Sequence, residues 1–292
     1  MLTAGGFDSA DTAAMRLALI EGDAERVALN YYWSLSADEQ QAYIDALGFD
    51  LDAAITDPGN RFNEASFYAS YEVGRPLVES IIATDGVDGL NTLLRSKDVG
   101  TTERLTDPLG ADRRSTDDAS TRIRLPVGVD ASVGDLGSIT WFQALAPVVG
   151  TGPALDAVIG YDDDTFAIFD ADGETCARFM VLFDSEGDAA EFAAIVGSLS
   201  GVSSLAVELD GVQVDICDPI GDPQDQRFGT ILPLIVSAEM ASMHLVNGEP
   251  VEVARCASLA QAKTIDAQES MAGFVGWDSV MADAAGFLDS CR

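Results

Sequence analysis

The acidic residue best placed for chemistry early in this chain is Glu21, in the run ALIEGDA over residues 18–24. On a helix over about residues 11–34, each residue advances 100°, so Glu21 lies opposite a polar arc. The arc that we expect to face water consists of Arg16, Asp23, Arg26 and Asn30. A carboxylate on the packed face requires a cation, hydrogen-bond donors or a raised pKa. The pattern therefore predicts a metal ligand at Glu21, supported one turn further on by Glu25.

The number of histidines limits the kinds of metal site to which Glu21 could contribute. Catalytic zinc takes three protein ligands and a water molecule. His244 is the only histidine in the sequence, so the sequence cannot supply two imidazole ligands. His244 follows Glu239 by five residues, a spacing poorly suited to chelation from one helix face. We interpret His244 as a structural residue or a helix cap, and we predict that the chain as given does not hydrolyse peptides through zinc.

Three segments resemble exported bacterial proteins related to the gluzincin zinc metallopeptidases. They are MRLALIEGDAERVA (15–28), RFNEASFYASYEVG (61–74) and DSEGDAAEF (184–192), and the likeness extends to about Gly201. In that family an upstream helix carries His-Glu-x-x-His, whose histidines bind zinc and whose glutamate is the base. A helix that carries the tetrapeptide Glu-Gly-Asp-Ala supplies the third zinc ligand, and Glu21 matches the glutamate of that tetrapeptide. The histidines and the base would fall before Met1, so either the chain begins too late or the scaffold has lost its metal site.

A cleft beside Glu21 is the one site that we predict. Its proposed walls are Tyr32, Tyr68, Tyr71 and Glu72, although simple aromatic packing is the alternative for the tyrosines. The resemblance implies a metallopeptidase-related exported protein that is inactive in this chain. The alternatives are an extracellular non-catalytic scaffold that binds a peptide or a cell-wall component, or a C-terminal fragment of an active zinc peptidase. We expect no cofactor in this chain, and we expect zinc only if the His-Glu-x-x-His motif exists upstream.

The composition narrows the choice of partners. Asp and Glu number 49 against 16 Lys and Arg, which gives a formal net charge of -33. This charge argues against nucleic acid and anionic membranes as partners and is more typical of solubility or salt tolerance. No apolar run approaches the roughly 18–20 residues that span a bilayer, and the N-terminus lacks a signal-peptide pattern. Hydrophobic residues make up 47% of the chain, enough for a folded core.

The cysteines indicate disulfides rather than a metal or redox site. Cys176, Cys217, Cys256 and Cys291 have none of the two-residue spacings of zinc or redox motifs. An even number of cysteines suits one or two disulfides in an exported protein. We favour Cys176 with Cys217, on neighbouring strands, and Cys256 with Cys291; three pairings are possible, and free buried thiols are the alternative. Together with the resemblance, this predicts an extracellular or cell-envelope location.

Periodicity predicts an α+β fold, with a helical N-terminal half that resembles a metallopeptidase core, followed by antiparallel hairpins with covering helices. We expect helices over 11–34, 36–47, 64–84, 87–95, 186–199, 228–245 and 277–288, and hairpins of 165–169 with 176–183 and of 204–209 with 212–217. The corresponding segments are a helical part over 1–100, a surface excursion over 101–137, an α+β part over 138–218 and a helical part over 219–292.

The sequence lacks the residue patterns of several other catalytic and binding sites. No serine lies in a Gly-x-Ser-x-Gly turn, and phosphate and dinucleotide loops are absent from the sequence. The acidic runs 162–164 and 170–174 do not match the ligand spacing of an EF-type calcium loop.

Overall fold

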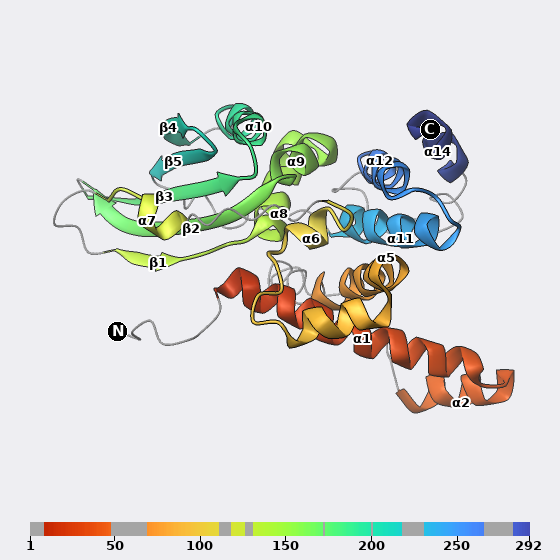
Figure 1. Cartoon of the computed structure of the whole chain (residues 1–292). Coiled ribbons are helices and arrows are strands. Elements are labelled where there is room, and N and C mark those ends of the chain that lie inside the picture. Colours follow the sequence, from red (N-terminus) through yellow and green to blue (C-terminus); the bar gives the residue numbers. More distant parts are fainter. Residues whose placement is uncertain are drawn as a thin grey trace.

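The computed structural model describes residues 9–47, 69–110, 118–125, 131–171, 173–199, 201–217, 231–265 and 283–292. Its fold is α+β, with helices and one antiparallel sheet (Figure 1). The helices are α1 (Ala10–Ser34), α2 (Ala37–Leu47), α5 (Gly74–Arg95), α6 (Glu103–Thr106), α7 (Ala119–Arg122), α8 (Ser138–Val149), α9 (Thr151–Val158), α10 (Glu186–Val196), α11 (Leu232–Val246), α12 (Val251–Ala262) and α14 (Ala284–Cys291). The strands are β1 (Ser132–Gly134), β2 (Tyr161–Ala171), β3 (Glu174–Phe183), β4 (Val202–Glu208) and β5 (Gly211–Cys217).

The sheet has the order β1-β2-β3-β5-β4, and every neighbouring pair is antiparallel. Both predicted hairpins form, because β2 pairs with β3 and β4 pairs with β5. The second turn consists of Leu209 and Asp210, one residue earlier than the expected Asp-Gly turn, since Glu208 pairs with Gly211. Leu209 takes the left-handed conformation that this tight turn requires, with φ of 56°.

Alternating residues of β3 face two different helical layers. Phe179 and Phe183 contact Trp141 of α8 and Phe192 of α10, respectively, with ring centroids 5.2 and 5.1 Å apart. Met180 and Leu182 point to the other face and pack in a small cluster with Ala119 of α7. The sheet is therefore covered on one face by α8 and α10 and partly covered on the other by α7, where the sequence predicted cover on one face only.

One hydrophobic core connects the sheet to the helices of the N-terminal half. Its largest fully buried side chains are Tyr161, Phe142, Phe183, Phe192, Met15, Leu19, Leu77, Leu105, Leu145, Leu155 and Leu234. Figure 1 shows α5 between α1 and α11, while α2 folds back against the far end of α1. The helical part and the sheet are thus packed against each other through α5, α6 and α8.

Local signals set several helix boundaries as predicted. The backbone N–H and hydroxyl of Ser36 donate to Glu39 at 2.9 and 2.7 Å, so the expected capping box opens α2. The two helices expected over 64–84 and 87–95 are one element, α5, with a break at Gly86, whose φ is 71°. The expected starts at residues 64, 228 and 277 lie outside the described residues.

Three expectations about elements were wrong. Residues 101–137 were expected to be a surface excursion, yet α6 is buried through Leu105 and Thr106. No helix was expected over residues 151–158, yet α9 forms there. Helix α12 was not anticipated; its buried face is mostly alanine and serine, which weakens the apolar period.

Both favoured disulfides are confirmed. Cys176 and Cys217 face each other across β3 and β5, and their sulfurs are bonded. Cys256 of α12 is bonded to Cys291 of α14 and so holds the C-terminal helix against the preceding one. Two disulfides are compatible with an extracellular protein.

No helix within the described ranges has both the length and the hydropathy to cross a bilayer.

Candidate functional site

Glu21 lies at the edge of the α1 packing surface rather than within it. The residues of α1 that are fully buried are Asp11, Met15, Ala18, Leu19 and Gly22. Glu21 is half-buried and accepts a hydrogen bond from the Tyr71 hydroxyl. Partial burial and the Glu21 carboxylate together raise the pKa of Tyr71. The expectation that Glu21 points into the interior was therefore wrong in degree, because a tyrosine at the border of two helices satisfies its carboxylate.

The glycine that follows Glu21 has a packing role. A Cβ atom on Gly22 would lie 2.3 Å from the backbone of Gly74, and one on Gly74 would lie 2.4 Å from the carbonyl oxygen of Ala18. Helices α1 and α5 thus cross with their backbones in contact, which only glycine permits. This crossing brings the residues that flank Gly22 on α1 beside the first turns of α5.

The crossing gathers four glutamates, which we call the acidic seam. Its members are Glu21 and Glu25 on α1, Glu72 immediately before α5, and Glu79 on α5. Burial raises the pKa of Glu25, the charges of Glu72 and Glu79 raise it further, and Arg75 opposes the shift. One carboxylate oxygen of Glu25, Oε2, is buried and has no hydrogen-bond partner within the part of the chain that the structure describes.

The one cation that lies in the acidic seam, among the described residues, is already engaged. Arg75 donates to both carboxylate oxygens of Glu79 at 3.1 Å and also pairs with Glu239 of α11. The hydroxyl of Ser242 donates to Glu79 at 3.4 Å. Arg75 therefore links α5 to α11 and leaves the seam with an excess of negative charge.

Only part of the predicted cleft is assembled. Tyr71 contacts Glu21, and Glu72 lies close enough to Glu25 to raise its pKa. Tyr32 is separated from Glu21 by eleven residues of helix, about 16 Å, and its ring instead packs on Tyr43, with centroids 5.8 Å apart. Placing Tyr32 in the cleft was thus wrong, and aromatic packing at the α1–α2 junction is its role. Tyr68 lies outside the described residues.

The residues present do not fit a catalytic zinc site. His244 is buried on α11, and burial lowers its pKa, so it is not a surface cap. Glu239 is held by Arg75. Among the described residues, no three His, Cys, Asp or Glu side chains are grouped so that they could hold a metal ion. Glu21 and Glu25 are therefore not accompanied, among the described residues, by the further ligands that a zinc site requires.

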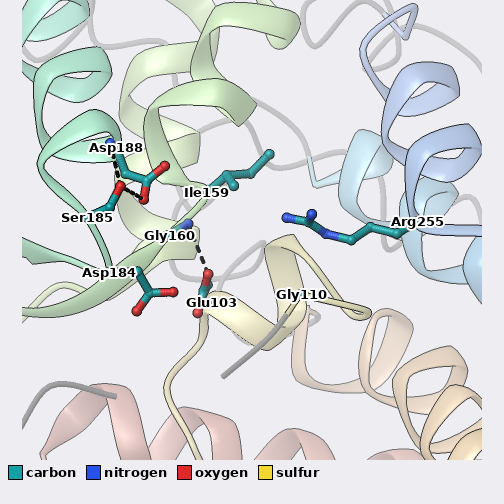
Figure 2. A pocket seen from close by; sticks show the side chains of 8 residues that line it. All are labelled: Glu103, Gly110, Ile159, Gly160, Asp184, Ser185, Asp188 and Arg255. Carbon is teal, nitrogen blue, oxygen red and sulfur yellow. Dashed lines mark hydrogen bonds between the residues drawn. The ribbon is translucent and has the colours of Figure 1, made fainter. Parts of the chain in front are cut away.

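A concave site lies between the sheet and the C-terminal helices (Figure 2). It encloses about 200 Å³ and is lined by Glu103, Gly110, Ile159, Gly160, Asp184, Ser185, Asp188 and Arg255. Figure 2 shows Arg255 reaching toward the pocket from the side opposite Asp184 and Asp188. Five separate parts of the chain meet here, from α6 to α12.

The polar groups of this pocket bond mainly to one another. The Gly160 N–H donates to Glu103 at 2.9 Å, and the Ser185 hydroxyl donates to Asp188 at 2.6 Å as it caps α10. Arg255 is bound to the buried carboxylate of Asp107 through Nε at 2.8 Å. The lining residues include no serine paired with a histidine base, so the pocket has no nucleophile of that type.

Sequence reasoning did not find the polar cluster that we call the buried acid network. Asp164 of β2 accepts hydrogen bonds from the Tyr161 hydroxyl at 2.8 Å, from Trp141 Nε1 at 2.9 Å and from the backbone N–H groups of Leu136 and Gly137. Asp11 of α1 lies nearby and accepts bonds from the N–H and hydroxyl of Thr102. These groups fix the start of α1 to the sheet.

Burial changes the titration of both carboxylates in this network. It raises the pKa of Asp164, although the four donors oppose the shift. It raises the pKa of Asp11 to about 7, with Thr102 opposing and Asp164 and Asp135 adding to the shift. The one sequence signal for this network was the Asp162–Asp164 run within an apolar strand, which we had tested only as a calcium loop.

No protein-family model, curated protein or solved structure matches this chain.

Proposed function

We propose that this chain is a metallopeptidase-related, non-catalytic extracellular protein that binds a positively charged peptide at the acidic seam. The observation that carries the proposal is the buried Oε2 atom of Glu25, which lacks a donor among the described residues beside an excess of carboxylates. A buried carboxylate oxygen without a donor costs about 1–3 kcal/mol or more. An ammonium or guanidinium group from a ligand would remove that cost and lower the pKa of Glu25.

The resemblance to gluzincins and the two disulfides support the extracellular, peptidase-related part of the proposal. The donor set supports binding rather than catalysis, because Glu21 is hydrogen-bonded by Tyr71 and the sequence supplies one histidine. A protein that uses a peptidase scaffold to hold a positively charged peptide would need negative charge at the binding surface, and the carboxylates of the acidic seam supply it.

Calorimetric titration of the full chain with hexalysine tests the binding proposal. We expect Glu25→Gln to weaken binding about fivefold or more, because the neutral amide loses the charge that meets the ligand. Glu252→Gln is the matched control, because it removes the same charge and Glu252 is exposed on α12. Equal affinity in Glu25→Gln and Glu252→Gln would mean that hexalysine responds only to net charge, which contradicts the proposed site.

The pH dependence supplies a second readout. Protonation of Glu25 removes its charge, and its pKa in the free protein is raised. We therefore expect hexalysine affinity to fall as the pH decreases from 7.5 toward the raised pKa, more steeply for the wild type than for Glu25→Gln.

The zinc alternative has its own test. We expect the purified chain to retain no stoichiometric zinc and to show no peptide hydrolysis. One zinc per chain, together with chelator-sensitive cleavage that Glu21→Gln abolishes, would establish the enzyme and reject a purely binding role.

A further inference from the structure

The most exposed face of α1 is apolar, contrary to the polar arc expected from the sequence. Ile20, Val27 and Tyr31 are 51%, 54% and 58% exposed, and Ala24 between them is exposed too. We call these four residues the apolar stripe. Of the four residues that were expected to face water, Arg16, Asp23 and Arg26 are half-buried and Asn30 is exposed. The helix therefore buries one face against α5 and presents a second apolar face on the opposite side.

The spacing of the apolar stripe matches the requirements of helix-on-helix packing. Its members recur at intervals of four, three and four residues, which keeps them in line along a helix. From Ile20 to Tyr31 the stripe is about 16 Å long, or three turns. A second helix presents ridges with the same spacing, whereas an extended strand presents side chains every second residue.

The two flanks of the apolar stripe differ in charge. At 100° per residue, Glu21 and Glu25 lie between the apolar stripe and the contact with α5, next to Glu72. On the other flank Asp23 and Arg26 form an ion pair at 2.7 Å and neutralise each other. An occupant of the stripe therefore meets carboxylates along one edge and a neutral surface along the other.

We propose that the partner of this surface is a cationic amphipathic helix, whose apolar face covers the stripe and whose Lys or Arg residues meet Glu21 and Glu25. This inference deepens the proposed function and rests on it. A second copy of the chain would bring another acidic flank and a net charge of -33, which opposes pairing. An anionic membrane surface would be repelled by the same carboxylates.

The test compares two peptides of identical leucine and lysine composition and about four helical turns. One has leucines at helical a and d positions, and the other has the same residues in scrambled order. Fluorescence anisotropy at physiological salt measures the affinity of the full chain for each. We expect the amphipathic peptide to bind at least about tenfold more tightly than the scrambled peptide.

Variants of two equally exposed valines locate the binding surface. Val27→Asp should weaken binding of the amphipathic peptide at least about tenfold, because it places a charge in the apolar contact. Val87→Asp is the control, since Val87 is also 54% exposed and lies on α5 beyond its break at Gly86. This control should change the affinity less than about twofold.

Four outcomes would overturn the inference. Equal binding of the two peptides, or equal affinity in Val27→Asp and Val87→Asp, would mean that the stripe does not hold a helix. If hexalysine binding still depends on Glu25 in that case, the proposed function stands and only the helical partner is wrong. If no cationic peptide binds, both proposals fail. If sedimentation shows a wild-type dimer that Val27→Asp dissociates, the occupant is a second copy.

Discussion

The acidic seam and the buried acid network contain the same functional group in opposite surroundings. In the network, Asp164 is almost fully buried, yet the donors around it include an indole, a phenol and two backbone N–H groups. In the seam, Glu25 is only partly buried, yet one of its oxygens has no donor among the described residues. The fold therefore uses donors to hold Asp164 in place and leaves the seam incomplete.

This contrast separates a structural carboxylate from a candidate binding carboxylate. A buried charge with a full set of donors contributes to the stability of the fold, because each donor would otherwise be buried without a partner. A partly buried charge without donors is a cost to the free protein that a ligand can remove. Burial by itself does not distinguish the two; the hydrogen-bond partners do.

The largest expected effect is the loss of the Asp164 carboxylate. Asp164→Ala leaves Trp141 Nε1, the Tyr161 hydroxyl and two backbone N–H groups without their acceptor, so we expect about 3–4 kcal/mol of destabilisation. Glu25→Ala should change the stability by less than about 1 kcal/mol, because it removes an unsatisfied group. Urea unfolding of both variants measures the difference. Similar losses at the two positions would remove the distinction drawn between the network and the seam.

A somewhat smaller effect is expected at the helix crossing that creates the seam. Gly22→Ala places a methyl group 2.3 Å from the Gly74 backbone and should destabilise the protein by about 2–3 kcal/mol. Gly286→Ala is the matched control, since nothing lies within 4 Å of a Cβ at that position in α14. The control should be neutral or stabilising by up to about 1 kcal/mol. A Gly22→Ala variant as stable as the control would show that the two backbones are not in contact.

The smallest expected effect is a pH dependence from Asp11. Its pKa is about 7 in the folded protein and 3.8 in the reference state, so the folded state binds more protons between these values. Stability contributed by this group is therefore lost as the pH rises from 4 to 7. The side chain of the Asp11→Asn variant cannot ionise, so relative to the wild type the variant should gain on the order of 1 kcal/mol of stability between pH 5 and pH 6.

Unfolding free energies of wild type and Asp11→Asn at the two pH values provide the measurement. The buried His244 contributes in the opposite direction, since burial lowers its pKa, and its contribution cancels because both proteins contain it. A constant difference between the two proteins at pH 5 and pH 6 would show that the pKa of Asp11 is not raised.

Much of the fold was predictable because its signals are local. Ser36 and Glu39 are three residues apart and meet as soon as the helix forms, so the start of α2 could be read directly. The strand period identified the β2–β3 hairpin, and its position favoured the pairing of Cys176 with Cys217. Helix α12 was missed because its buried Ala254 and Ala257 carry little hydrophobic signal.

The candidate site was only partly predictable. The sequence indicated that the Glu21 carboxylate needs a partner, and in the structure the hydroxyl of Tyr71, fifty residues away, donates to it. Its role as a metal ligand stays a prediction. The position of Tyr32 on the same helix gave no indication that it would turn toward Tyr43 on α2. A helical wheel gives the angle of a side chain around the axis, and it does not say which angles a neighbouring helix will cover.

By itself the sequence determined the α+β class, most of the helices, the hairpins and the strongly acidic character of the chain, and it favoured the two disulfide pairs among three possible pairings. These features depend on residue periodicity, on turn and cap chemistry and on composition, all of which act over short distances. The tertiary structure alone decided which carboxylates acquired donors and which face of α1 stayed open. The packing of α1 on α5 through Gly22 and Gly74 fixed the rotation of the helix, and that rotation left an apolar stripe facing water beside an acidic seam.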